Sequence, residues 1–223
     1  MKKSETDPLF NIVVIGANGG IGRQAVEIAL NAGHHVTAIV RNPANLVLAH
    51  PNLETVKGDI MQPATFEKYL ANKDMVLSAI GVRGGLMGDK PTTLYSQGNA
   101  NLLQVMKKTG IRRVFFISAS AVEISPVLPL VVRWVARNII QKLLRNMYAD
   151  LRVMEQLVKG SDTDWTIMRP PRLVDKPATG HYRIEVNGFL RNCLTISRAE
   201  VAHFMVHNLA NASTYKTTIE IGY

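Results

Sequence analysis

The sequence predicts an α/β fold with a doubly wound parallel sheet, and two observations lead to it. From residue 11 onward, apolar stretches of strand length alternate with stretches of helical periodicity, which is the pattern of parallel strands joined by crossover helices. The first strand runs straight into a glycine-rich turn and a helix, in the stretch FNIVVIGANGGIGR at residues 10–23. A strand, a glycine turn and a helix in that order are typical of the first unit of such a sheet.

The expected elements follow in chain order. The strands are Asn11–Ile15, His35–Val40, Leu53–Lys57, Met75–Ala79, Val114–Ser118, Trp165–Met168 and Lys216–Ile221, with a short alternating strand at Tyr182–Val186. The helices are Ile21–Asn31, Ala64–Leu70, Tyr95–Lys108, a long one from about Leu130 to Lys159, and Arg198–Asn211. The last helix has a capping signature, because Ser197 and Glu200 stand three residues apart at its start.

Length and composition are compatible with one domain. Of the 223 residues, 47% are hydrophobic, which suffices for a sizeable core. Residues 1–9 are expected to be a flexible lead and residues 10–223 the domain, with a small C-terminal substrate-covering portion. The single cysteine, Cys193, permits no intrachain disulfide, and there is neither a signal-peptide pattern nor an apolar run of about 18 residues. We therefore expect a cytoplasmic protein without a transmembrane segment.

The charge balance is basic, with a formal net charge of +9. Aromatic residues make up only 6% of the chain, and no basic run is interleaved with them, so nucleic acid is not an expected partner. An anionic small ligand accounts for part of the excess, and a generally basic surface for the rest.

The long basic helix has two interpretations. On a helical wheel one face is apolar, with Ala136, Ile139, Ile140, Leu143, Met147, Leu151, Met154 and Val158. The other face carries Arg133, Arg137, Gln141, Arg145 and Arg152. Such a helix covers a sheet or forms a dimer interface with its cationic face solvated, or it binds a membrane surface. The chain is accordingly expected to be a monomer or a homodimer.

The glycine turn predicts a dinucleotide site of the Rossmann-like kind. Gly16 can make the tight turn, Gly19 can let backbone approach a pyrophosphate, and Gly22 can let the helix pack closely on the strand. The neighbouring residues Asn18, Gly20 and Ile21 are expected to bind the cofactor as well. The alternative is a glycine-rich turn without a ligand.

The residue after the second strand predicts which dinucleotide binds. An acidic residue there would bind the ribose hydroxyls of NAD, whereas Arg41, followed by Asn42, offers a charged planar group to a 2′-phosphate. NADP is therefore the expected cofactor. The alternative is an ordinary surface arginine.

The next two strand ends complete the expected cofactor site. Asp59 and Ile60 follow the third strand and can bracket the adenine, although Asp59 can equally cap the next turn. After the fourth strand, the small residues of the segment 79–81 can lie under the nicotinamide-side ribose, and an arginine follows. The residues concerned are Ala79, Ile80, Gly81 and Arg83.

Candidate catalytic groups follow the fifth and sixth strands. Ser118 and Ser120 offer hydroxyls that can polarise a substrate carbonyl, and Ser118 is also placed against the cofactor. Serines after a strand are also ordinary turn formers. Pro170 and Pro171 form an expected wall near the nicotinamide, and Arg172 can reach an anionic substrate group.

A family resemblance rests on several of these stretches: GANGGIG, VRN, GDI, ISA, MRPPRLVDKPATG, PTTLYSQGN at 91–99 and SRAEVAHFMVHNL at 197–209. Together they resemble the atypical short-chain dehydrogenase/reductases, with the closest likeness to the biliverdin reductase B (flavin reductase) type and its NmrA-like relatives. The resemblance implies a Rossmann fold, an NADP cofactor, and reduction of flavins, quinones or related conjugated acceptors.

Two positions depart from those families. In place of the usual Tyr-x-x-x-Lys pair the chain has Tyr148 and Arg152, which lie toward the polar side of the wheel and either face a site or form a solvated pair. Ala119 stands where the biliverdin reductase type carries a serine, and Arg172 where it carries a histidine.

A metal site is not expected. His203 and His207 stand four residues apart, but no glutamate follows His203 and no third ligand is evident. The leading hypothesis is an NADPH-dependent reductase of a small conjugated acceptor. The alternative is an NADP(H)-sensing regulatory protein of the NmrA kind without turnover. A sugar-nucleotide epimerase or dehydratase is disfavoured, because such reactions need a competent acid/base pair.

Overall fold

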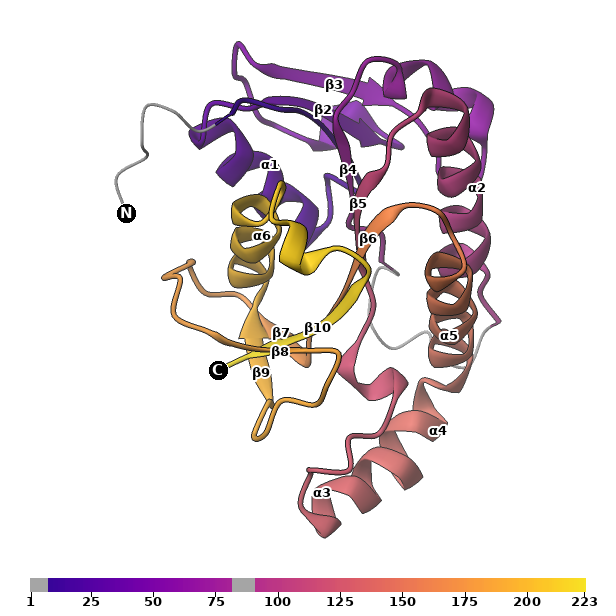
Figure 1. Cartoon of the computed structure of the whole chain (residues 1–223), viewed down its shortest axis with the longest axis vertical. Helices are drawn as coiled ribbons and strands as arrows, with labels where there is room; N and C mark the ends of the chain where they lie inside the picture. Colours follow the sequence, from indigo (N-terminus) through magenta and orange to yellow (C-terminus); the bar gives the residue numbers. More distant parts are fainter. Residues whose placement is uncertain (1–7, 82–90) are drawn as a thin grey trace.

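The computed structural model describes residues 8–81 and 91–223, and its centre is an eight-stranded sheet in the order β3-β2-β1-β4-β5-β6-β10-β8 (Figure 1). All neighbouring strands pair in parallel except β8, which runs antiparallel to β10 at one edge. The strands are β1 (Asn11–Ile15), β2 (His35–Val40), β3 (Leu53–Lys57), β4 (Met75–Ser78), β5 (Arg113–Ile117), β6 (Asp164–Arg169), β8 (Arg183–Val186) and β10 (Thr217–Gly222). A separate parallel pair joins β7 (Arg172–Val174) to β9 (Thr195–Ser197).

Helices cover both faces of the sheet, which confirms the predicted fold class. One face is covered by α1 (Gly20–Asn31) and α6 (Arg198–His207), and the other by α2 (Leu94–Thr109) and α5 (Arg145–Lys159) (Figure 1). Alternate residues of β1 pack into the apolar layers on opposite faces of the sheet, because successive side chains of a strand point to opposite faces. The central strands β1, β2 and β4 are therefore mostly apolar and are buried along nearly their whole length, as expected for a sheet that is covered on both faces.

The C-terminal portion is tied to the first helix. The Ser197 hydroxyl accepts from the Glu200 amide at 3.0 Å, which confirms the cap predicted for α6. The buried Glu200 carboxylate in turn accepts from the Thr179 amide at 2.8 Å and the Gly180 amide at 3.1 Å, and so holds the loop before β8. The apolar side of α6 packs directly on that of α1 in one continuous cluster.

Two predicted helices are wrong. In place of a helix at Ala64–Leu70 the chain forms two 3₁₀ turns, Pro63–Thr65 and Glu67–Leu70. Between them, Phe66 leaves helical geometry with φ −130° and places its side chain in the core, where it is fully buried. Burial of this ring thus outweighs the local helical pattern.

The long helix predicted from about Leu130 to Lys159 is broken at Leu144, where φ is −109° and ψ is 22°. Before the break lie α3 (Leu130–Val135), a π-helical turn at Ala136–Ile140 and α4 (Gln141–Leu143), and after it comes α5. Only α5 packs on the sheet. The first part extends beyond the sheet, below α5 in Figure 1.

The single apolar face predicted for this helix is also wrong. Leu151, Met154 and Val158 of α5 are buried, whereas Ile139 and Leu143 before the break are exposed. Residues 1–7 of the expected flexible lead lie outside the described residues, as does Arg83. In the part of the chain that is described, no helix is long and apolar enough to cross a bilayer.

Candidate functional site

A cleft of about 330 Å³ opens at the carboxyl ends of β1 to β4. The strand order reverses between β1 and β4, and open α/β sheets bind their ligands at this switch point. Four segments form the walls: the turn after β1, the ends of β2 and β3, and the segment after β4. The lining residues that the sequence predicted for the cofactor are Gly16, Asn18, Gly19, Arg41, Asn42, Asp59, Ile60, Ala79, Ile80 and Gly81.

The glycine turn has a geometry that side chains would obstruct. Gly16 has φ +78°, a left-handed conformation, and a Cβ on it would lie 2.6 Å from the Ala79 carbonyl oxygen. A Cβ on Gly22 would lie 2.3 Å from the Gly16 carbonyl oxygen, so the close approach of α1 to the turn requires glycine. Bare backbone of this kind fits the cradle that a pyrophosphate needs.

The start of α1 is open toward the cleft. Gly19 is the exposed N-cap residue, no side chain among the described residues caps the helix, and its first turn carries no acidic residue. The positive end of the helix dipole is therefore available to an anion. One cation lies beside it: the side-chain stem of Arg198 packs on Gly20, where a Cβ would lie 2.3 Å from Arg198 Cδ.

Of the two residues after β2, the side chain of Asn42 has a hydrogen-bond partner within its own turn, whereas that of Arg41 forms no ion pair with the described residues. Asn42 Oδ1 accepts from the Ala44 amide at 3.2 Å and caps the 3₁₀ turn Pro43–Asn45. Arg41 is exposed at the cleft and forms no ion pair within residues 8–81 and 91–223. In the part of the chain that is described, its guanidinium thus has no carboxylate partner that a phosphate would have to displace.

Asp59 lines the cleft and also stabilises its own turn. Its Oδ1 accepts from the Met61 amide at 3.0 Å, and its backbone amide donates to the Thr65 hydroxyl at 2.9 Å. The turn places Ile60 against the cleft with its side chain buried. Both interpretations of Asp59 are thus compatible with its position.

Residues 16–212 match the family model described as NAD(P)H-binding. The chain belongs to this NAD(P)H-binding family. The cleft, with its bare glycine turn at a helix N-terminus, fits that assignment. Nicotinamide chemistry supplies a hydride when such a cofactor is bound, and here the residues of the glycine turn and the strand ends would hold it.

Solved structures of low sequence identity share the fold of this NAD(P)H-binding protein. A short-chain dehydrogenase/reductase from Veillonella parvula in complex with NADP superposes with a TM-score of 0.77 at 19% identity, over 97% of this chain and 95% of that one. ChuY, an anaerobillin reductase from Escherichia coli O157:H7, superposes with a TM-score of 0.71 at 21% identity, over 95% and 96%. At this level of identity both show a shared fold.

Curated relatives are of more varied length. The photosystem II assembly factor Ycf39 of Synechocystis is 29% identical over 149 residues, which is 66% of this chain and 44% of that protein. An uncharacterised chloroplastic protein of Arabidopsis thaliana is 26% identical over 229 residues, covering 99% of this chain and 80% of that protein. The chain therefore spans less than half of the first relative and most of the second.

Some lining residues were not predicted from the sequence. They are Ile15, Ile39, Val40, Asn45, Gly58, Met61 and Leu94. Gly58 directly precedes the predicted residues Asp59 and Ile60, and the structure leaves no room for a side chain there, because a Cβ would lie 2.7 Å from Ile39 Cγ2. Met61 and Leu94 reach the cleft only through tertiary packing, and no local pattern signals them.

Other predicted residues do not line this cleft: Gly20, Ile21, Gly22, Ser118, Ser120 and Pro170. Ser118 is buried, and its hydroxyl donates to Glu155 Oε1 at 2.7 Å. Ser120 begins a 3₁₀ turn after β5. The sequence therefore identified a strand end correctly at Ser118 but not the carboxylate that binds its hydroxyl.

Tyr148 does not lie on the polar side of its helix, contrary to the expectation. It is buried in the apolar layer between α2 and α5, on the same side as Leu151. Burial raises the pKa of Tyr148, and the nearby charge of Arg152 only partly offsets this. Arg152 itself donates to the Val122 carbonyl oxygen at 3.1 Å.

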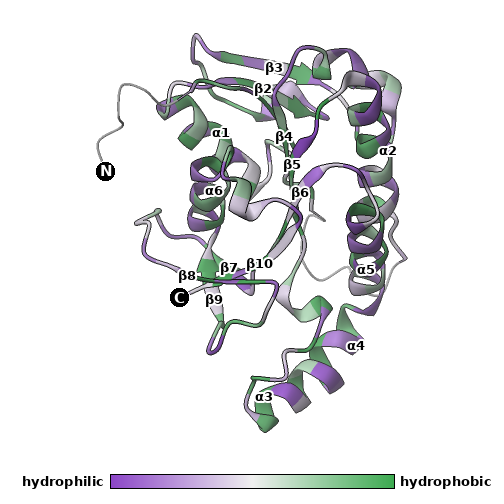
Figure 2. Cartoon of the chain, viewed as in Figure 1, coloured by the Kyte–Doolittle hydropathy of each residue, from purple (hydrophilic) through white to green (hydrophobic). Residues whose placement is uncertain are grey.

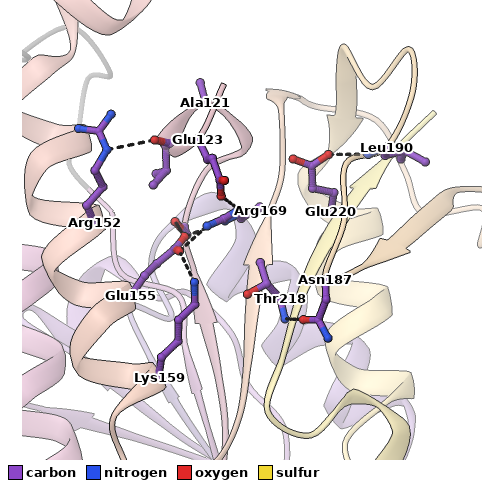
Figure 3. Close-up of polar contacts among 12 residues, drawn as sticks. Ala121, Glu123, Arg152, Glu155, Lys159, Arg169, Asn187, Leu190, Thr218 and Glu220 are labelled. Atoms are coloured by element: carbon purple, nitrogen blue, oxygen red, sulfur yellow. Dashed lines mark hydrogen bonds and ion pairs between the residues drawn. The ribbon is translucent and has the colours of Figure 1, made fainter. Parts of the chain in front are cut away.

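A buried ion-pair network lies at the carboxyl end of β6 (Figure 3). Arg169 Nε donates to Glu155 Oε1 at 2.9 Å, and its Nη1 donates to Glu123 Oε2 at 3.0 Å. Lys159 Nζ lies 3.4 Å from Glu155 Oε2. This network joins α5 to the ends of β5 and β6, immediately before Pro170.

The network keeps both central groups charged. Burial opposes ionisation of Glu155, but the hydrogen bonds and charge of Arg169, with help from Ser118 and Lys159, lower its pKa overall. For Arg169, burial is likewise outweighed by Glu155 and Glu123, so its pKa is raised. Paired charges at these positions tolerate a burial that a single charge would not.

The histidines on α6 form a small aromatic cluster. The rings of His203 and His207 stack with centroids 3.9 Å apart, and the Tyr182 hydroxyl lies 3.2 Å from His203 Nδ1. Among the described residues, no three histidine, cysteine or acidic side chains are grouped so as to hold a metal ion.

Proposed function

We propose that the protein is an NADPH-dependent reductase of a small conjugated acceptor, such as a flavin or a quinone. The observation that carries the proposal is the cleft itself, where a bare glycine turn after β1 lies beside Arg41 after β2, an arginine with no ion-pair partner in the described part of the chain. Membership of the NAD(P)H-binding family supports cofactor binding, and the likeness of fold to an anaerobillin reductase is compatible with a conjugated acceptor. The sequence resemblance to the biliverdin reductase B type supports the same class.

The acid–base groups favour an acceptor that needs little proton catalysis. The Ser118 hydroxyl already donates a hydrogen bond to Glu155, and Tyr148 is buried with a raised pKa, so neither is set up to protonate a substrate. Reduction of a flavin or quinone builds charge on a delocalised ring, and solvent can supply the proton. We place this activity in the cytoplasm, in keeping with a single, buried and unpaired Cys193.

Turnover separates this proposal from its alternative, an NADP(H)-sensing protein of the NmrA kind. The same engaged Ser118 and buried Tyr148 favour that alternative. We expect NADPH oxidation at 340 nm with FMN, riboflavin or simple quinones, at a rate that saturates with acceptor. Tight NADPH binding with no oxidation in the presence of any acceptor would instead establish the sensor.

Replacement of Arg41 by Ala tests the cofactor preference. If Arg41 binds the 2′-phosphate, Arg41→Ala should weaken NADP binding by about 1.5–3 kcal/mol, the scale of a hydrogen bond to a charged group, and barely change NAD binding. Titration calorimetry with both dinucleotides measures the difference.

Arg191→Ala is the matched control, because Arg191 is exposed and does not line the cleft. It removes the same charge from the surface and should leave both affinities unchanged. An equal loss for NAD and NADP in Arg41→Ala, or no loss, would show that Arg41 does not read the phosphate. Arg23, which pairs with Glu27 at 3.1 Å on the surface, can take over part of the contact, so Arg41→Ala gives a lower bound on the contribution of Arg41.

A further inference from the structure

The segment that precedes α5 exposes an unusual amount of apolar surface. We call Leu130–Leu143, which comprises α3, the π-helical turn and α4, the arm. Of the 17 large apolar side chains that are exposed in the described residues, seven lie in the arm: Leu130, Val131, Val132, Trp134, Ile139, Ile140 and Leu143. Trp134 is 61% exposed. Tryptophan at such exposure is costly in water and points to a covered state.

The arm is held in place but is not covered. Arg133 donates to the Pro126 carbonyl oxygen, and Gln141 Nε2 donates to the Ala121 carbonyl oxygen at 3.1 Å. These bonds fix it to the chain between β5 and α3. Figure 1 shows the arm extending past the end of the sheet, and Figure 2 shows hydrophobic and hydrophilic residues interspersed along it.

All charged residues in the arm and in the sequence immediately beside it are basic. The cations are Arg133, Arg137, Lys142 and Arg145, and the sequence holds no acidic residue from Ile124 to Ala149. Arg137, Lys142 and Arg145 are exposed, and within the described residues they form no ion pair. A partner for this surface must therefore combine apolar contact with negative charge.

We infer that the arm docks on the surface of an anionic lipid bilayer, with Trp134 and its apolar neighbours in the boundary between headgroups and acyl chains. Helices with exposed tryptophan and leucine beside lysine and arginine lie in this interface. The cations then face anionic headgroups, and each cation adds to the electrostatic attraction between the arm and the bilayer. A second copy of the chain is the less favourable occupant, because it would bring one acid-free cationic arm against another.

Vesicle sedimentation tests the inference on the whole protein. We expect binding to phosphatidylcholine vesicles that contain about 30% phosphatidylglycerol, and much weaker binding to phosphatidylcholine alone. The chain has two tryptophans, and Trp165 is already buried, so a blue shift of fluorescence on binding reports Trp134.

Leu130→Glu combined with Trp134→Glu should weaken vesicle binding at least about tenfold, because both apolar contacts are replaced by charges that the lipid repels. Leu194→Glu is the matched control: Leu194 is 60% exposed, lies outside the arm, and should bind as wild type does. Arg137→Gln and Lys142→Gln should each weaken binding about fivefold, and raised salt should do the same. An unchanged melting temperature in all variants shows that folding is retained.

Three results would overturn the inference. Equal binding to neutral and anionic vesicles would remove the role of the cations. Wild-type vesicle binding by the double glutamate variant would place the contact elsewhere. A dimer in analytical ultracentrifugation that the double variant dissociates, with no vesicle binding by wild type, would make the arm an interface between two copies.

Discussion

Glu155→Gln is expected to lower the free energy of unfolding by about 3–5 kcal/mol at pH 7, since it leaves the buried guanidinium of Arg169 without its main counter-charge. Arg169 is only 7% exposed in its side chain, so water cannot replace the lost carboxylate. Urea denaturation followed by circular dichroism measures the change.

The effect should depend on pH with a definite sign. Because the folded state lowers the pKa of Glu155, its contribution to stability is complete above the pKa of the unfolded state. It is lost as the pH falls through the lower pKa of the folded state. The difference between Glu155→Gln and wild type should therefore be constant at neutral pH and shrink in acid.

Glu123→Gln is the matched control, because Glu123 also pairs with Arg169 but its side chain is 59% exposed. Loss of this exposed partner should lower the free energy of unfolding by no more than about 1 kcal/mol. Equal losses in the two variants would contradict the assignment of Glu155 as the partner that stabilises Arg169.

Gly19→Asp is expected to abolish stabilisation by NADP while leaving the apo protein close to its normal melting temperature. The carboxylate would stand where the pyrophosphate is expected, at the positive end of α1. At an NADP concentration of about 100 times the dissociation constant, the free energy of unfolding of the wild type should rise by about 2.7 kcal/mol. That of the variant should not change. Thermal melts with and without NADP measure both quantities.

The structure makes this substitution permissible for folding. Gly19 has φ −80°, which any residue adopts, although a Cβ would lie 3.1 Å from the Gly16 carbonyl oxygen and must shift slightly. Gly19→Ala is the control that keeps this steric change without the charge. A Gly19→Asp protein that still gains as much from NADP as wild type would show that the dinucleotide binds elsewhere.

The fold was predictable because its signals are local. The strands β1, β2, β4, β5 and β6 are rich in apolar residues, whereas β3 is mixed, and the sequence pattern places each of the six to within a residue or two. The long helix was misjudged for an equally physical reason. A helical wheel assumes one constant period over the whole segment. The π-helical turn and the break at Leu144 interrupt that period without any change in the residue pattern that would reveal them.

The cleft could be predicted from the sequence and the ion-pair network could not, again because one depends on local signals and the other on packing. The glycine turn and the strand ends are sequence-local, so most residues predicted from them do line the cleft. Glu155 and Arg169 lie on different elements, and only the packing of α5 on the sheet brings them together. A glutamate within a helix and an arginine at a strand end carry no sign of each other in the sequence, so this pair could not be predicted.

The packing of α6 on α1 restricts how such a protein can be re-engineered. The segment after β6 is built around α6, and α6 shares its apolar layer with the helix whose first turn faces the cleft. Transplanting that segment from a relative would bring a foreign surface onto α1. A working chimera would therefore need the matching α1 side chains exchanged together with it. The segment after β6 and the helix at the cleft therefore do not form independently exchangeable units.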